Sequence, residues 1–194
     1  MRYLPRANPY LIVLLNFMFC RPLRDIITSM PIKPAQPNER MRPQRPAWDS
    51  YFLKLAHVVT ERSNCLRMAV GVVIVKDKHI IATGYNGTPA GVPNCIDGGC
   101  ERCLQRQKNL LSAGERKDLC ICIHAEQNAI LQSAYHGVST KGAILYATVA
   151  PCLQCSKAII NAGISTVIYE GDYQDDRGIS LLLSTGLTVR KSQS

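Results

Sequence analysis

The sequence predicts an α/β protein, a three-layer α/β/α sandwich around a mixed five-stranded sheet. The chain has 194 residues, 46% of them apolar and 19% charged, which is the composition of an ordinary folded domain. Two β-branched runs follow each other across a short polar turn near residue 77. Beyond residue 124, segments with helical spacing alternate with short β-type runs. Two adjacent strands followed by alternating helices and strands indicate helices packed on a mixed sheet.

The first predicted element is a helix over roughly 50–62, with Asp49 or Ser50 as its cap. Two strands follow at 70–75 and 79–84. A connection rich in Gly, Cys and Lys then runs to about residue 123, and connections this long are usually functional or clamped by a metal. The remaining elements are expected as helix, strand, helix, strand, helix and strand, at 125–135, 143–148, 152–162, 166–169, 175–185 and 187–190.

The first 46 residues differ in composition from the rest of the chain. They hold eight of the eleven prolines, a density that opposes regular helix or strand. Residues 1–46 are therefore predicted to be a poorly ordered extension, and residues 47–194 the folded domain. An apolar run at 10–20 lies between arginines and leaves three interpretations open. The run could be the core of a signal peptide. The whole Arg-rich, acid-poor segment could instead be an organelle transit peptide, or a dispensable extension upstream of a start at Met30 or Met41.

Much of the positive charge also lies in this extension. The formal net charge is +9, but residues 1–46 contain eight Lys and Arg against two acidic residues. Residues 47–194 contain fifteen Lys and Arg against twelve acidic residues, which is close to balance. Such a balance does not indicate a basic groove for long nucleic acids. No apolar run reaches the ~18 residues of a membrane-spanning helix, which argues against an integral membrane protein.

Cysteine is the unusual residue of this sequence. Nine cysteines cannot all pair within one chain, and three close spacings are typical of metal ligands. The three pairs are Cys100 and Cys103, Cys120 and Cys122, and Cys152 and Cys155. Thiols available for metal binding indicate a reducing compartment, because structural disulfides are rare there. We therefore expect a cytoplasmic location, with organelle targeting by the extension left open.

Two motifs carry the expected chemistry: HAE at 124–126 and PCLQC at 151–155, each opening a predicted helix. The imidazole of His124 and the thiolates of Cys152 and Cys155 can fill three positions of a tetrahedral zinc site. Catalytic zinc centres of this kind leave the fourth position open for water. The positive end of a helix dipole also favours thiolate over thiol, and therefore ligation at neutral pH.

Glu126 adds a carboxylate to this group. Residues two apart on a regular helix point in nearly opposite directions, so His124 and Glu126 share a site only if His124 lies at the helix start. Glu126 would then stand beside the water and move its proton to a ring nitrogen and a leaving amine. The order H-x-E…P-C-x-x-C matches the signature of zinc nucleobase deaminases. A purely structural zinc is the alternative, but it would more readily recruit Cys120 or Cys122 and would leave Glu126 unexplained.

The sequence around these motifs resembles the deoxycytidylate (dCMP) deaminases of the cytidine deaminase superfamily, above all the fungal-type enzymes. The resemblance covers about residues 45–190. Its most specific segment is GYNGTP, and a GGCERC stretch is shared with the fungal type. The matching segments are RPAWDSYF at 45–52, RSNC at 62–65, VG at 70–71, ATGYNGTP at 82–89, GGCERC at 98–103, HAEQNAI at 124–130, PCLQC at 151–155, AGI at 162–164, and Tyr169 and Tyr173.

The resemblance implies a cytidine deaminase-like fold and the hydrolytic conversion of dCMP to dUMP and ammonia, which supplies dUMP for thymidylate synthesis. It implies that His124, Cys152 and Cys155 bind the catalytic zinc and that Glu126 shuttles protons. Four further residues are expected to contact the substrate. Asn86 would lie near the sugar, Tyr173 near the phosphate, Arg67 as a charge partner of the phosphate, and Ala125 in the substrate pocket.

The resemblance also implies a homo-oligomer, commonly a hexamer, that dCTP activates and dTTP inhibits. Mg²⁺ is expected to accompany the regulatory nucleotide. Regulatory contacts are expected near the GYNG loop, where Gly84 and Gly87 would let a nucleotide approach the backbone. One position departs from the pattern, because Tyr135 stands where several relatives carry a basic residue.

A second, structural zinc is predicted within the long connection. Four thiolates make a closed zinc site, and some relatives carry an additional zinc at the positions of Cys65 and Cys95. The predicted ligands are Cys65, Cys95, Cys100 and Cys103. Cys120 and Cys122 could substitute as ligands, and a set of free thiols is the alternative to a metal.

Four other functions are weighed against dCMP deamination. An RNA- or DNA-editing deaminase needs a basic, aromatic surface to hold a polymer, and the balanced charge of 47–194 argues against it and against a tRNA adenosine deaminase. A nucleoside or pterin-like substrate stays open, because the phosphate contacts are the weakest assignment. The complete HAE and PCLQC motifs argue against a non-enzymatic zinc module.

Overall fold

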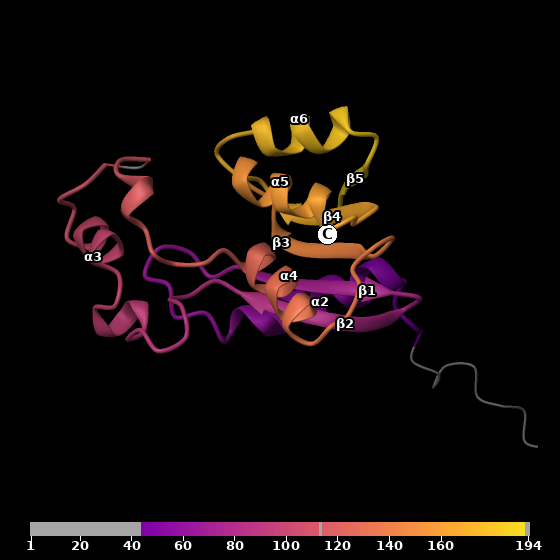
Figure 1. Ribbon diagram of the computed structural model, residues 1–194, viewed down its shortest axis with the longest axis horizontal. Helices are drawn as coiled ribbons and strands as arrows, with labels where there is room; N and C mark the ends of the chain where they lie inside the picture. The colour runs from indigo at the N-terminus through magenta and orange to yellow at the C-terminus, as the bar shows by residue number, and fades with distance from the viewer. Residues whose placement is uncertain (1–43, 113, 193–194) are drawn as a thin grey trace, which may run out of the picture. The chain divides into compact units, whose positions relative to one another are not determined.

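The five predicted strands form one mixed sheet in the computed structural model, which describes residues 44–112 and 114–192 (Figure 1). The order across the sheet is β2-β1-β3-β4-β5. β1 pairs antiparallel with β2 and with β3, whereas β3, β4 and β5 run parallel. The mixed five-stranded sheet predicted from the sequence is therefore confirmed. The strands are β1 Gly71–Lys76, β2 His79–Tyr85, β3 Ile144–Val149, β4 Thr166–Gly171 and β5 Thr188–Lys191.

β1 lies inside the sheet and is buried on both faces. Its side chains alternate, so Val72 and Ile74 join one core while Val73 and Val75 join the other. A strand that is covered on both faces loses the polar alternation of a surface strand, which explains its continuous β-branched sequence.

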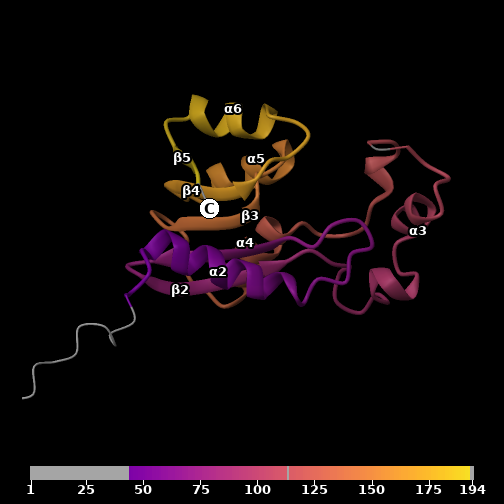
Figure 2. The same cartoon turned by 180° about the vertical axis from the view of Figure 1, so that it is seen from behind.

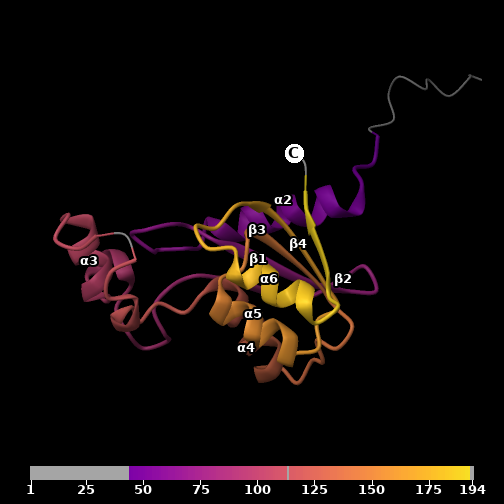
Figure 3. The ribbon, with the colours of Figure 1, turned by 90° about the horizontal axis from the view of Figure 1, so that it is seen from above.

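Helices cover both faces of the sheet and make three layers, as predicted. α2 (Trp48–Thr60) packs on one face, in front of the sheet in Figure 2. α4 (Ala125–Tyr135) and α5 (Leu153–Asn161) pack on the other, and α6 (Arg177–Ser184) lies on that same side against α5 (Figure 3). None of the described helices is long and apolar enough to cross a bilayer.

The prediction that Asp49 or Ser50 caps the first helix is wrong. α2 begins at Trp48, with Ala47 in the capping position and no side-chain cap. Asp49 lies in the first turn and accepts a hydrogen bond from the buried Tyr146 hydroxyl at 2.9 Å. It also pairs with Arg190 at 3.1 Å, so one carboxylate ties α2 to β3 and β5. Burial and the neighbouring carboxylate raise the pKa of Tyr146 well above its usual range, so its hydroxyl remains a donor.

The long connection after β2 contains more regular structure than its sequence indicates. It holds α3 (Glu101–Gln107) and two single 3-10 turns, η3 (Cys95–Asp97) and η4 (Lys117–Leu119). In Figures 1 and 2 this lobe lies at the end of the sheet opposite the β1–β2 turn. The N-terminal extension predicted for 1–46 lies outside the described residues up to position 43 and stays a prediction.

The close approach of α4 to β2 depends on Gly84. A Cβ atom there would lie 2.2 Å from the carbonyl oxygen of Ala125 and 2.5 Å from the amide nitrogen of Ala129. The absence of a side chain at Gly84 therefore lets a helix approach the strand, whereas the resemblance implied the approach of a nucleotide. Since α4 begins beside His124, this contact also fixes the position of the first metal motif.

We expect Gly84→Ala to lower the free energy of unfolding by about 1–3 kcal/mol, because the new methyl group meets helix backbone that cannot move aside locally. Gly87→Ala is the matched control, since a Cβ there has only ordinary contacts with the Asn64 side chain, the nearest at 3.6 Å. Urea unfolding of both variants measures the effect. Equal stability of the two variants would contradict the packing argument.

Candidate active site

The two sequence motifs meet where α4 and α5 begin. His124 is the N-cap of α4 and Cys152 the N-cap of α5, each with an extended backbone conformation. The amide of His124 donates to the Gln127 side chain at 3.3 Å, which closes the first turn of α4. Cys155 lies one turn into α5 and is fully buried. Both helices therefore direct their positive ends at the same place.

The three predicted ligands form a compact donor group. The Nδ1 atom of His124 lies 3.4 Å from the sulfur of Cys152 and 3.3 Å from that of Cys155. Tetrahedral zinc with normal bond lengths would place a nitrogen and a sulfur ligand about 3.6 Å apart. Within the part of the chain that the structure describes, the group contains these three donors and no fourth. The donor set fits zinc with one coordination position left open.

The charge state of the group also suits a metal. The pKa of Cys152 is lowered to about 4, because the thiol of Cys155 donates to it and His124 and the Cys155 amide contribute further. The same contact raises the pKa of Cys155. Hydrogen bonding to Cys152 raises the pKa of His124, against the opposing effect of burial. A negative sulfur is thus present at the start of α5.

Glu126 lies beside this group without belonging to it. His124 is at the helix start, so the geometric condition for a shared site is met. The carboxyl group is only 4% exposed, interacts with Cys155, and is not one of the three clustered donors. Burial raises its pKa. A carboxyl group with a raised pKa can both accept and release a proton near neutral pH.

A cavity of about 570 Å³ opens onto the group and separates it from the α3 lobe. His124, Glu126 and Cys152 lie in its wall. The four predicted substrate residues, Asn86, Ala125, Tyr173 and Arg67, line it as well. Further basic side chains reach it from the lobe and from α6: Arg102, Arg106, Lys117 and Arg177.

These four further basic residues are already engaged: Arg102 and Arg106 donate to the carbonyl oxygens of Glu115 and Leu111. Arg177 is held by Asp175 at 2.5 Å, and Lys117 lies over the Tyr173 ring, 5.8 Å from its centre. Arg67 is exposed and makes no ion pair with another described residue. A phosphate entering the cavity would therefore find a free guanidinium at Arg67 and a cation already stacked on Tyr173.

Asn86 serves the fold as well as the cavity. Its Oδ1 atom accepts from the Ser63 hydroxyl at 2.7 Å and from the Val70 amide at 2.8 Å. Its Nδ2 atom donates to the Met68 carbonyl at 2.7 Å. These bonds anchor the segment before β1 to the end of β2. One amide hydrogen is left for a ligand, so the expected contact with a substrate is restricted to a donated hydrogen bond.

The cysteines of the lobe gather differently from the predicted set of four. Cys103 and Cys122 belong to two overlapping groups, one completed by Cys65 and Cys95 and the other by Cys100 and Cys120. The predicted ligands Cys65, Cys95, Cys100 and Cys103 are thus divided between the groups. The spacing along the chain could not show that Cys120 and Cys122 point toward the lobe. Neither Cys120 nor Cys122 joins the His124 group, although a purely structural zinc site would have recruited one of them as a fourth ligand.

Comparison with known proteins agrees with this geometry. The family described as "Cytidine and deoxycytidylate deaminase zinc-binding region" matches residues 46–170, which include both motifs and the GYNGTP segment. The chain belongs to this family. Its zinc-binding region is thus the part of the molecule that carries the candidate site.

Individual members of the cytidine and deoxycytidylate deaminase family are similar over most of this chain. Deoxycytidylate deaminase of Saccharomyces cerevisiae is 41% identical over 172 residues, which is 87% of this chain and 52% of that protein. The Schizosaccharomyces pombe deoxycytidylate deaminase is 45% identical over 148 residues, 76% of this chain and 44% of that protein. The chain spans about half the length of these two relatives.

A solved family structure shares the fold. The dCMP deaminase from the cyanophage S-TIM5, in complex with dCMP and dUMP, superposes with a TM-score of 0.62 at 34% identity. The match covers 77% of this chain and 100% of that one.

We expect Cys152→Ser to remove one zinc ion per chain, because a serine hydroxyl is a poor replacement for the thiolate. Lys157→Ala, an exposed position on the same helix, is the control and should keep the full complement. Metal analysis of the purified proteins gives the count. Unchanged zinc in Cys152→Ser would contradict the assigned donor group.

Proposed function

We propose that this protein catalyses the zinc-dependent hydrolysis of dCMP to dUMP and ammonia. The observation that carries the proposal is the buried Glu126 carboxyl beside a three-donor zinc site inside a cavity of nucleotide size. The two fungal relatives are named deoxycytidylate deaminases, and the cyanophage enzyme was solved with dCMP and dUMP. The dUMP formed would supply thymidylate synthesis.

The reaction adds water at C4 of the cytosine ring and releases the amino group as ammonia. Zinc bound by His124, Cys152 and Cys155 would supply the Lewis acid that makes water nucleophilic at neutral pH. Glu126 takes a proton from the water and delivers a proton to ring nitrogen N3. It then takes the second proton of the added water from the new hydroxyl at C4 and passes it to the departing amine, so that ammonia leaves and the carboxylate is regenerated. Its burial keeps bulk water away from these transfers.

Substrate selection depends on the residues expected to contact the phosphate. Arg67, Lys117 and Tyr173 line the cavity and bring two positive charges and a hydroxyl to it. A phosphate bound by a guanidinium gains a charge-assisted hydrogen bond that a nucleoside lacks. The proposal therefore includes a preference for dCMP over deoxycytidine.

Regulation by dCTP and dTTP forms part of the same proposal. A second cavity, of about 610 Å³, is lined by residues of the GYNGTP segment together with Asn128, Gln132 and His136 of α4 and its C-terminus. No Lys or Arg is among its described lining residues. A triphosphate bound there needs positive charge from Mg²⁺ or from a second copy of the chain, which agrees with the expected oligomer, commonly a hexamer.

We expect Glu126→Gln to lower kcat by about 10²- to 10⁴-fold, because the amide cannot transfer a proton. The substitution keeps the size of the side chain and does not touch a ligand, so the zinc content should not change. Steady-state kinetics and metal analysis on the same preparation test both statements. Wild-type turnover in this variant would overturn the assigned role of Glu126.

We expect Arg67→Ala to lower kcat/KM for dCMP by about 10- to 100-fold, the value of a hydrogen bond to a charged group, and to leave deoxycytidine turnover unchanged. Arg62→Ala is the matched control, since Arg62 is also exposed but does not line the cavity. Ammonia release from dCMP and deoxycytidine by the wild type gives the reference. Equal wild-type rates on the two substrates would refute the phosphate preference.

The same assay tests regulation when it is run with dCTP or dTTP, each with and without Mg²⁺. Activation by dCTP and inhibition by dTTP are the expected results. A rate that neither nucleotide changes would refute regulation and would leave the deaminase proposal intact.

A further inference from the structure

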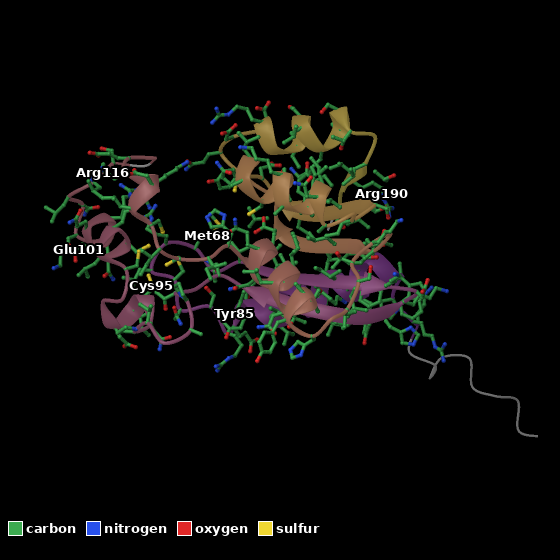
Figure 4. All side chains as sticks on the ribbon, viewed as in Figure 1. Met68, Tyr85, Cys95, Glu101, Arg116 and Arg190 are labelled. Carbon is green, nitrogen blue, oxygen red and sulfur yellow. The ribbon has the colours of Figure 1, made fainter. Side chains whose placement is uncertain are left out.

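The α3 lobe contains a group of six cysteines, Cys65, Cys95, Cys100, Cys103, Cys120 and Cys122, here called the thiol cluster. They come from separate parts of the chain: the segment before β1, η3, the start of α3, and the segment between η4 and α4. Figure 4 shows sulfur atoms gathered beside the labelled Cys95, apart from the sheet. Each of the six is a free thiol.

The thiol cluster consists of two sets of four sulfurs that share one edge. Within each set, all four sulfurs lie within 4.8 Å of one another, and Cys103 and Cys122 belong to both sets. The sulfur of Cys120 lies 3.9 Å from that of Cys100 and 3.8 Å from that of Cys103. Four sulfurs around tetrahedral zinc lie about 3.8 Å apart, so these separations suit a shared metal. They are far longer than the ~2.05 Å of a disulfide bond.

Individual sulfur contacts also place Cys103 and Cys122 in the middle. The thiol of Cys122 interacts with Cys65 of one set and Cys120 of the other. The thiol of Cys103 interacts with Cys95 of the first set and with Cys100 of the second. The shared pair is therefore central in its contacts as well as in its set membership.

We propose that the thiol cluster binds two zinc ions, with Cys103 and Cys122 bridging them. Cys65 and Cys95 complete the shell of one ion, and Cys100 and Cys120 complete that of the other. Two tetrahedral ions need eight ligand positions, and six sulfurs provide eight when two of them are shared. A single ion would use four sulfurs and leave two as thiols. This inference goes beyond the proposed function, because neither ion takes part in the reaction.

The composition of the lobe supports a metal framework. Several of its apolar side chains are exposed, with Ile96 at 60% and Leu110 at 69%, whereas Cys95, Cys100 and Cys103 are buried and form its core, with Leu66 packed against them. The lobe thus has sulfur where a domain normally has hydrocarbon. A segment of this size without an apolar core needs a metal or disulfides to hold one conformation. The distances between the sulfur atoms exclude disulfide bonds, so a metal is the framework that remains.

The charge of the surroundings agrees with bound thiolates. Six thiolates and two divalent ions carry a net charge of −2. Arg102, which precedes Cys103 in α3, is buried, and its guanidinium donates to the Glu115 carbonyl oxygen at 2.9 and 3.0 Å. It makes no ion pair with a carboxylate among the described residues. An anionic cluster next to it in the chain would balance this buried charge.

The count of zinc in two full-length proteins tests the inference. We expect three zinc ions per chain in the wild type and two in Cys152→Ser, measured by metal analysis and by native mass spectrometry. In the Cys152→Ser protein all the zinc that remains belongs to the thiol cluster, so the zinc count of this variant does not depend on the proposed reaction. One zinc or none in that protein would overturn the two-ion cluster, even if the deaminase activity of the wild type were confirmed.

Substitutions in the Cys152→Ser background test how the ions are held. Adding Cys65→Ser or Cys100→Ser should each leave one zinc, and adding both should leave none. If the cluster held a single ion, one of these two substitutions would remove no zinc. X-ray absorption at the zinc edge should show a zinc–zinc contact in the parent protein that is lost in either of these variants. Where a variant fails to fold, the zinc count of the parent protein and its zinc–zinc contact decide the question.

Discussion

The convergence of two helix N-termini on one point is the constraint on which the site depends. α4 and α5 begin at the same end of the sheet, and their N-caps are His124 and Cys152. The extended backbone of an N-cap lets its side chain turn back over the first turn, where free amides and the helix dipole favour a negative ligand. The pKa of Cys152 at the start of α5 is lowered first by the hydrogen bond that the Cys155 thiol donates, and further by His124 and the Cys155 amide. Neither helix could supply this environment alone.

The same arrangement explains how Glu126 takes part without binding metal. On a continuous helix it would face away from His124, but the helix begins only after His124. Because His124 precedes the helix, its imidazole does not have to follow the direction of the helical side chains. The Glu126 carboxylate in the first turn can therefore lie beside it, buried and close to Cys155. A helix start one residue earlier would separate the two groups. The close contact of α4 with Gly84 fixes where that start lies.

Periodic segments made most of the fold predictable, and non-local contacts account for what the sequence could not show. The helix at 125–135 was predicted with its observed bounds because its cap and its glycine stop are local signals. Asp49 looked like a cap, but its partners Tyr146 and Arg190 lie about 100 residues or more away in the chain. The two metal motifs could be paired from the sequence because each is short and complete. The thiol cluster could not be resolved, because six cysteines from separate segments allow several groupings that only the folded chain distinguishes.

Ile123 connects the thiol cluster to the donor group of His124, Cys152 and Cys155. It lies between Cys122 and His124, and its backbone exchanges two hydrogen bonds with Gly87, of 2.8 and 3.2 Å. A lobe held by sulfur responds to oxidants and chelators, to which a hydrocarbon core is indifferent. Such agents would loosen the wall that the lobe contributes to the cavity while the sheet stayed intact. The thiol cluster would then pass a change in redox state or metal supply to the metal-binding group of the sheet, because Cys122 lies only two residues from His124.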